Sequence, residues 1–418
     1  MSTLSKLANS LVGSEIVKLG NDINNKISNG AKIYNYTIGD FNTDFFPIPE
    51  FLKDEIIKAY EEGFTNYPPG DGLLRLRKSV STFVKKHQHV DYATNEIQIA
   101  CGGRPFIYTI FRTIVDPGDK VIYAVPSWNN NHYTSMCGGI ACEVATTPEN
   151  NFMPTPESIA PHLSDAVLLC LCTPQNPTGT VMSKEDLKSI CDMVVAENNR
   201  RSAEQKKLYV LFDQMYSLLT FKDTEHYHPV ALNQEMRDYT ITLDGMSKSF
   251  AGTGVRVGWG FGPASIIAKI KALMSHIGTW APMAEQVATS VFLDNEAAVN
   301  DALKVQKDKI EERLWKIYEK IENLNKKGLP IAAIPPMAAI YMTIKIDLKG
   351  KSYQEKTFNQ QEEVTQFLID EVGLALVPFH CFGADPESPW YRVSVGTSKL
   401  EDLDIIFNKL EDIFNQLR

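Results

Sequence analysis

Between residues 96 and 263 the chain alternates short apolar segments with longer amphipathic ones. Several of the short segments are rich in β-branched residues and apolar on both faces, as strands are when helices cover both sides of their sheet. This alternation is typical of βαβ units. The sequence therefore predicts an α/β fold whose large domain has a mostly parallel, roughly seven-stranded sheet flanked by helices. The predicted strands are 96–103, 120–128, 139–146, 166–173, 208–214, 239–245 and 256–262.

The longer segments between these strands repeat apolar residues at helical spacing. We expect crossover helices at 105–116, 183–200 and 264–277. The segment 296–326 contains neither Pro nor Gly and favours one long helix. After it the pattern becomes α+β. Strands are predicted at 338–347, 374–380 and 391–396, and helices at 362–372 and 399–417.

A chain of 418 residues exceeds what one hydrophobic core usually supports, so we expect more than one domain. Residues 1–45 are predicted to be an N-terminal segment that joins a smaller α+β domain. Residues 46–295 are predicted to form the large domain that carries the sheet. Residues 296–418 are predicted to contain a linking helix and the C-terminal part of the small domain.

Composition narrows the classes of ligand. The formal net charge of −9 disfavours binding to nucleic acid or to an anionic membrane, because both need clustered Lys and Arg. No apolar run reaches the length of about 18 residues that a membrane span requires, and the first 20 residues lack a signal-peptide core. The seven cysteines are odd in number and mostly apolar in context, which predicts reduced thiols. We therefore expect a cytoplasmic protein that binds small molecules.

Polar clusters follow three successive predicted strands. They are the Asn-Pro-Thr-Gly tetrapeptide 176–179, Asp213 with Tyr216, and Ser247 with Lys248. In open α/β sheets ligands bind outside the carboxyl ends of the strands, so these side chains are expected to converge. A lysine, a carboxylate, an amide and a phenol in one crevice suit pyridoxal 5′-phosphate.

Each of these groups has a chemical reason to be there. The amine of Lys248 forms a Schiff base with the cofactor aldehyde, and Asp213 keeps the pyridine nitrogen protonated. Asn176 and Tyr216 are expected to hydrogen-bond the ring oxygen and so tune the protonation of that linkage.

In these motifs the chain resembles the class I/II aminotransferases of the fold-type I, aspartate-aminotransferase-like superfamily. The tetrapeptide 176–179, the Asp213–Tyr216 spacing and the segment Ser247–Gly258 follow in the family's order over nearly the whole chain. The resemblance implies a transaminase that moves an amino group between an L-amino acid and a 2-oxo acid by ping-pong kinetics. Aspartate-type or aromatic substrates are expected, and Lys248, Asp213 and Tyr216 are the expected catalytic residues.

The resemblance also assigns the phosphate end of the cofactor. Arg256 is expected to bind the phosphate by a charge-assisted contact. Gly103 and Arg104, at the start of a predicted helix, are expected to donate backbone amides. Relatives carry Ser or Thr three positions before the lysine, where this chain has Gly245, so Ser247 is the expected substitute.

The remaining site residues come from the same resemblance. Trp128 is similar to the aromatic that stacks on the cofactor ring, and we expect both it and Asn176 to contact substrate as well. Arg392 resembles the arginine that binds the substrate α-carboxylate in a bidentate manner, with the backbone of Gly39 close by. Tyr67 matches a tyrosine that reaches the phosphate of the neighbouring subunit, which implies a homodimer.

No metal site is expected. The pairs His226 with His228 and His87 with His89 lack a partner cluster and are interpreted as exposed loop histidines.

Two other function classes remain open. A carbon–sulfur lyase or an aminocyclopropane-carboxylate-synthase-like enzyme would share the lysine, the carboxylate and the arginines. A non-catalytic sensor domain would bind cofactor without turnover, but this chain lacks an added basic DNA-binding module. The motifs leave the amino donor and acceptor undetermined, because loop residues set side-chain specificity.

Overall fold

The computed structural model describes residues 3–418; Met1 and Ser2, where the predicted N-terminal segment starts, lie outside the described residues. The chain divides into two compact units. The larger unit comprises residues 43–309 and 337–339, and the smaller unit comprises residues 1–42, 310–336 and 340–418. Within residues 3–418, no helix combines the length and the apolar composition that crossing a membrane requires.

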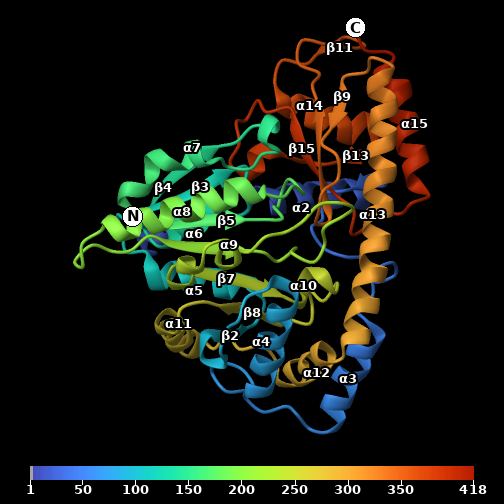
Figure 1. Cartoon of the computed structure of the whole chain (residues 1–418). Helices are drawn as coiled ribbons and strands as arrows, with labels where there is room; N and C mark the ends of the chain where they lie inside the picture. The colour runs from blue at the N-terminus through green and yellow to red at the C-terminus, as the bar shows by residue number, and fades with distance from the viewer. Residues whose placement is uncertain (1–2) are drawn as a thin grey trace. The chain divides into compact units, whose positions relative to one another are not determined.

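The larger unit contains a seven-stranded sheet with the order β2-β8-β7-β6-β5-β3-β4 (Figure 1). Only β8 runs antiparallel to its neighbours β2 and β7. The predicted mostly parallel sheet is therefore confirmed, and each of the seven predicted strands corresponds to an observed one. Their bounds are β2 Ile97–Ala100, β3 Lys120–Val125, β4 Ile140–Ala145, β5 Ala166–Cys172, β6 Tyr209–Asp213, β7 Thr240–Gly245 and β8 Gly258–Phe261.

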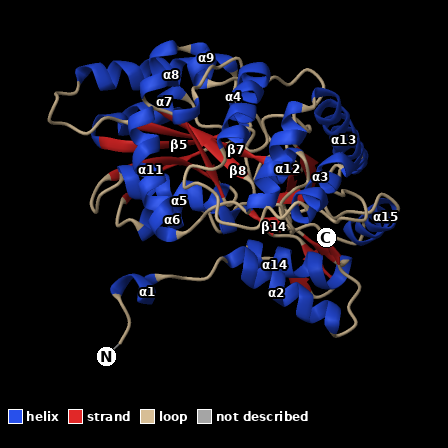
Figure 2. Cartoon of the chain, turned by 90° about the horizontal axis from the view of Figure 1, so that it is seen from below, coloured by secondary structure: helices blue, strands red, loops and turns tan. Residues whose placement is uncertain are grey.

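Helices cover both faces of this sheet, as the apolar strands require. Figure 2 shows α4 and α8 on one side and α5, α6 and α11 on the other. The main core gathers strand residues such as Leu169, Val210 and Phe212 with helix residues such as Val194. The helices are α3 Glu50–Glu61, α4 Leu74–Gln88, α5 Gly103–Ile114, α6 Asn130–Met136, α7 Pro156–Ile159, α8 Lys184–Arg200, α9 Pro229–Leu232, α10 Met246–Ser249, α11 Ala264–Ile277 and α12 Met283–Asp294.

The smaller unit is α+β. Its main sheet is antiparallel with the order β14-β15-β10-β9, and β1 pairs in parallel with β13. The strands are β1 Tyr34–Asn35, β9 Ile331–Ala333, β10 Tyr341–Ile346, β11 Ser352–Tyr353, β12 Lys356–Thr357, β13 Leu374–Ala375, β14 Val377–Pro378 and β15 Trp390–Ser394. The helices are α1 Lys6–Ser10, α2 Glu15–Ser28, α14 Gln361–Phe367 and α15 Asp402–Phe414.

The long helix predicted at 296–326 is α13, Glu296–Lys326. The division between the two units falls inside it, after Lys309. The larger unit also takes in Met337–Ala339, which lies between β9 and β10 in sequence.

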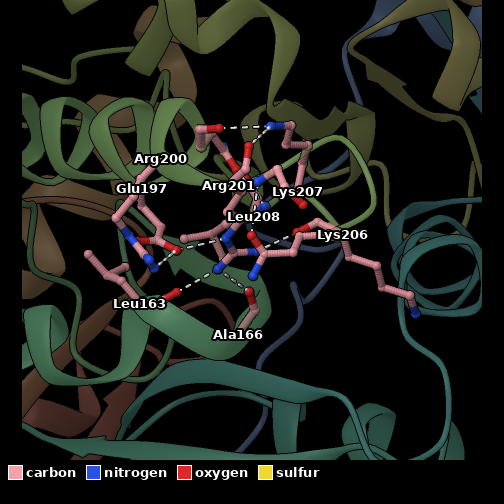
Figure 3. Close-up of polar contacts among 11 residues, drawn as sticks. Leu163, Ala166, Glu197, Arg200, Arg201, Lys206, Lys207 and Leu208 are labelled. Carbon is pink, nitrogen blue, oxygen red and sulfur yellow. Dashed lines mark hydrogen bonds and ion pairs between the residues drawn. The ribbon is translucent and has the colours of Figure 1, made fainter.

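A buried arginine fastens the amino ends of two sheet strands to the end of α8. Arg201 donates to the carbonyl oxygens of Leu163 at 2.6 Å, Ala166 at 2.8 Å and Lys206 at 2.7 Å, and pairs with Glu197 at 2.8 Å (Figure 3). Its side chain is only 3% exposed. This one guanidinium therefore satisfies three carbonyl groups that would otherwise lose their partner.

We expect Arg201→Ala to lower the free energy of unfolding by about 3–5 kcal/mol, because it leaves buried carbonyl acceptors unpaired and leaves Glu197 with the exposed Arg200 as its remaining cation. Urea denaturation followed by fluorescence measures the change. Arg200→Ala is the matched control, since Arg200 also bonds Glu197 but is 60% exposed. It should cost no more than about 0.5 kcal/mol. Equal effects of the two substitutions would contradict this account.

Candidate active site

The three motif segments leave the same edge of the sheet. Strands β5, β6 and β7 are parallel neighbours, and their register pairs Cys172 with Asp213 and Asp213 with Leu243. Their carboxyl ends are therefore level. The loop of Asn176, the segment that starts at Asp213, and the turn that leads to Lys248 all begin at this edge.

Lys248 lies in the short helix α10, which starts immediately after β7. The turn is held by a hydrogen bond from the Met246 N–H to the Val257 carbonyl at 3.0 Å. Lys248 is partly buried, while its neighbours Ser247 and Ser249 are 7% and 1% exposed. The lysine thus comes from a turn that is packed on both sides, which limits the positions of its amine.

Asp213 ends β6, and burial raises the pKa of its carboxyl to about 6. It accepts a hydrogen bond from the Met215 N–H at 3.1 Å, a neutral donor. Burial, together with the charge of Asp213, raises the pKa of the nearby thiols of Cys170 and Cys172. These groups offer the carboxylate no positive charge. A protonated ring nitrogen would supply one, so this environment fits a pyridinium.

A cation lies against the amino end of α5. Arg256 donates to the carbonyls of Cys101 at 2.9 Å and Thr253 at 2.7 Å. A Cβ atom added to Gly102 would lie 2.2 Å from the guanidinium Nη2 of Arg256. Arg256 also has a positive φ of 59°, a strained backbone state that tends to cluster at functional sites. Its guanidinium and the first amides of α5, where Gly103 stands, together fit a phosphate group.

Three glycines let the turn that carries Lys248 approach the amino end of α5 closely. A Cβ atom at Gly245 would lie 2.8 Å from the Cα of Gly258, and one at Gly258 would lie 2.9 Å from the carbonyl carbon of Gly102. At both of these contacts, backbone atoms lie directly against backbone atoms. A serine or threonine at position 245 would therefore clash, which gives a steric reason for the departure from the family pattern noted in the sequence.

Arg104 and Trp128 also lie together. The guanidinium carbon of Arg104 is 4.8 Å from the Trp128 ring centroid, within the range of a cation–π contact. Arg104 is exposed and Trp128 partly buried. The side chain of Arg104 therefore forms part of the wall beside the predicted ring-stacking residue.

Tyr133 belongs to the same region, although no predicted motif contains it. Tyr133 lies on α6 and is 6% exposed, and burial raises its pKa while the charges of Arg104 and Asp213 act on it in opposite directions. Nothing in the segment 130–136 marks this tyrosine, because its neighbours come from β6 and α5.

The loop of Asn176 is fixed by its neighbours. Gln175 donates to the Pro126 carbonyl at 2.7 Å, and the Ala338 N–H donates to the Gly179 carbonyl at 2.9 Å. Asn176 is partly buried, and Tyr216 is 4% exposed. The segment Met337–Ala339 is a second contributor that the sequence motifs did not indicate.

In the smaller unit, Arg392 on β15 is held as a flat, buried group. It is 3% exposed and donates to the Thr37 carbonyl at 2.7 Å. Its guanidinium carbon lies 4.7 Å from the ring centroid of Tyr341 and 4.9 Å from that of Phe382. A Cβ atom at Gly39 would lie 3.7 Å from both terminal nitrogens. The structure thus brings Arg392 and Gly39 together, as expected for a carboxylate site.

Tyr67 is the most exposed of the predicted aromatic site residues. It is 85% exposed and lies edge-on to Trp280, with ring centroids 5.2 Å apart. A separate cleft of about 530 Å³ in the larger unit has an acidic lining, and its lining residues include none of the predicted site residues.

The prediction of exposed loop histidines was wrong for three of the four residues: His228 is buried, His226 and His87 are half-buried and His87 lies within α4, whereas His89 is exposed. His228 is 2% exposed and bonds Thr242 at 2.9 Å, and His226 stacks on Phe212. Burial lowers the pKa of His226 to about 4 and that of His228 to about 3. Both histidines are therefore neutral; His228 belongs to the core and His226 is half-buried, because the segment after β6 folds back over the sheet.

Comparisons with known proteins agree with this geometry. The family described as "Aminotransferase class I and II" matches residues 31–410. The chain is 28% identical over 376 residues to an aspartate aminotransferase of Bacillus sp. (strain YM-2), covering 90% of this chain and 88% of that protein. It is 31% identical over 377 residues to a Bacillus subtilis (strain 168) protein named "Probable N-acetyl-LL-diaminopimelate aminotransferase", covering 90% and 87%.

Solved structures share the fold. The aspartate aminotransferase from Rhizobium meliloti aligns with a TM-score of 0.91 at 22% identity, over 100% of both chains. The Thermus thermophilus aspartate aminotransferase solved with maleate aligns with a TM-score of 0.86 at 24% identity, over 99% of this chain and 100% of that one. The chain belongs to the class I and II aminotransferases, pyridoxal-phosphate-dependent transaminases of the aspartate-aminotransferase-like fold.

Proposed function

We propose that this enzyme transfers the amino group of an amino acid with a second carboxylate to a 2-oxo acid by ping-pong kinetics. The observation that carries the site assignment is the contact of Arg256 with the amino end of α5, which the glycines at 102, 258 and 245 join to the turn of Lys248. The segment that suits an anion and the turn that carries the amine of Lys248 therefore pack directly against each other.

We assign the roles as follows. When bound, the cofactor supplies a ring that accepts electrons from the substrate α-carbon. Lys248 would hold the cofactor through its amine, and the same amine would act as general base and acid, taking the proton from the substrate α-carbon and passing it to the cofactor. Asp213 holds the proton on the ring nitrogen, while Asn176 and Tyr216 bind the ring oxygen. Ser247 and the amides of Gly103 and Arg104 join Arg256 at the phosphate, and Trp128 covers the ring.

A half-reaction tests this proposal. Mixing the loaded enzyme with amino acid alone should release one equivalent of 2-oxo acid and convert the aldehyde spectrum of the cofactor to the amine spectrum. Release of pyruvate with ammonia or sulfide would identify a lyase instead. Cofactor binding without any conversion by a broad set of amino acids would support the sensor alternative.

The choice of substrate class rests on two supports. Aspartate and N-acetyl-LL-diaminopimelate, which appear in the names of two relatives, both carry a second carboxylate. Arg104 is an exposed cation beside Trp128 and suits that carboxylate. We expect aspartate-type donors to give a higher kcat/KM than phenylalanine or tyrosine with 2-oxoglutarate, pyruvate or oxaloacetate as acceptor. A preference for the aromatic donors would overturn the choice.

Arg392 is proposed to bind the α-carboxylate of the substrate. We expect Arg392→Lys to raise KM for the amino donor about tenfold or more, because an ammonium cannot make the bidentate contact of a guanidinium. Steady-state kinetics measures the change, and cofactor affinity should stay unchanged. Arg237→Lys is a suitable control, since Arg237 lies in the larger unit and pairs with Glu96 at 2.7 Å. An unaltered KM in Arg392→Lys would refute the role.

We propose that the enzyme is a homodimer in which Tyr67 reaches the phosphate of the neighbouring site. The larger unit exposes apolar side chains that a partner would cover: Tyr60, Phe64, Tyr67, Leu74 and Ile277. One chain has a mass of 46.9 kDa, and light scattering should give twice that value. A monomer with full activity would contradict both the dimer and the role of Tyr67.

We also propose a cytoplasmic location. All seven cysteines are free thiols, and Cys137, Cys170 and Cys191 are buried. Such use of cysteine is typical of proteins in reducing compartments.

A further inference from the structure

Asp244, the penultimate residue of β7, is a second buried carboxylate near the candidate active site. It is 2% exposed. Its Oδ1 accepts from the Gly245 N–H at 2.7 Å. Its Oδ2 accepts from Gln88 Nε2 at 2.9 Å, Gln214 Nε2 at 3.2 Å and Ser217 Oγ at 3.4 Å. All four groups donate a hydrogen bond to the carboxylate of Asp244. An ionised carboxylate, which only accepts, suits this arrangement.

The donors come from segments that carry the proposed catalytic groups. Gln214 and Ser217 lie on either side of Tyr216, directly after Asp213. Gly245 opens the turn to Lys248, and Gln88 is the last residue of α4. One carboxylate thus joins the segment of Asp213 and Tyr216 to the segment of Lys248. Such a junction fixes the geometry between the two, because a buried carboxylate loses much stability if its donors move away.

We propose that Asp244 is a positioning residue of the transaminase, which holds these two segments together and adds a buried negative charge at the base of the turn that carries Lys248. This charge would favour the cationic form of the linkage that Lys248 would make with the cofactor. The inference rests on the proposed function and goes beyond it, since Asp244 itself makes no contact with substrate in this scheme.

The surroundings of Asp244 let its carboxyl gain or lose a proton near neutral pH. Burial, with a further contribution from Asp213, raises the pKa of Asp244 to about 7, against the lowering effect of its hydrogen bonds. The titratable groups that face it are Asp213 and, through Gln214, His226, whose Nε2 lies 3.2 Å from Gln214 Oε1. His226 is neutral, because burial lowers its pKa to about 4. No compensating cation is therefore supplied from that side.

The test is Asp244→Asn, which keeps the shape and removes the charge. The pH midpoint of the absorbance change of the bound cofactor should fall by about one unit relative to the unmodified enzyme, because the cationic form loses its stabilising charge. The cofactor should still attach to Lys248, as borohydride trapping would show. Ser217→Ala is the matched control: it removes only the longest of the four hydrogen bonds, at 3.4 Å, and leaves the charge, so the midpoint should shift by much less.

A second variant covers the case in which Asp244→Asn fails to fold. Gln88→Met removes the 2.9 Å donor from α4, which makes the carboxylate harder to ionise, so the midpoint should shift in the same direction but less. An unchanged midpoint in either folded variant would overturn the proposal, as would an equal shift in Ser217→Ala. If the unmodified enzyme formed no Schiff base, the proposed function itself would fail, which is a distinct result.

Discussion

Lys248→Ala is expected to abolish the Schiff-base absorbance and to reduce kcat by about a thousandfold or more, while the protein stays folded. The amine is the proposed attachment point for the cofactor and the group that moves the α-proton, so its loss removes both functions. Lys248 is only partly buried and sits in a short helix held by backbone hydrogen bonds, so truncation should leave the fold intact. Absorbance spectra, borohydride trapping and circular dichroism measure the three expectations.

Lys269→Ala is the control for this substitution, because Lys269 is exposed on α11. It should transaminate at the normal rate. A Lys248→Ala enzyme that also kept the normal rate would refute the assignment of the cofactor lysine and, with it, the roles built on that lysine.

Asp213→Asn is expected to lower kcat by about a hundredfold or more. An amide cannot hold a proton on the pyridine nitrogen as a carboxylate does, so the ring accepts electrons less readily. The cofactor-free protein offers a pH test as well. Because burial raises the pKa of Asp213 to about 6, the carboxylate is neutralised as pH falls through that value. Cofactor affinity should therefore decline below about pH 6, and less steeply in Asp213→Asn.

Steady-state kinetics and fluorescence titration with cofactor measure these two effects. Asp238→Asn removes an exposed carboxylate from the same unit and should change neither quantity. Normal turnover in Asp213→Asn would show that another group protonates the ring.

The alternation of apolar and amphipathic segments was enough to predict the sheet. The predicted strands 120–128 and 166–173 contain β3 and β5, and helix 264–277 coincides with α11. The apolar pattern did not predict strand direction: β8 is antiparallel to both neighbours, yet all four of its residues are buried, as are nearly all residues of the parallel strands β5 and β7. The order of strands was also not encoded locally, since β2 lies at one edge beside β8. Both features depend on contacts between distant segments.

The motifs proposed a site, and the structure adds the contacts that no motif contains. Arg256 contacts Gly102, although the two residues are far apart in sequence. Asp244 likewise accepts a hydrogen bond from Gln88 on α4. Nothing near Gln88 distinguishes it from an ordinary surface glutamine. Side chains of this kind are recognised only when their partners are known, because their importance comes from burial and from hydrogen bonds rather than from spacing.

The segment Met337–Ala339 has a consequence for biosynthesis. Its backbone bonds to Gly179, Leu219 and Phe221 at 2.8–3.0 Å, so the larger unit is finished by residues that follow β9. When the ribosome has released the chain up to residue 309, every strand of the seven-stranded sheet is present, but residues 337–339 are not. Until residues 337–339 have also emerged, the nascent larger unit lacks these three hydrogen bonds to the segments that follow β5 and β6.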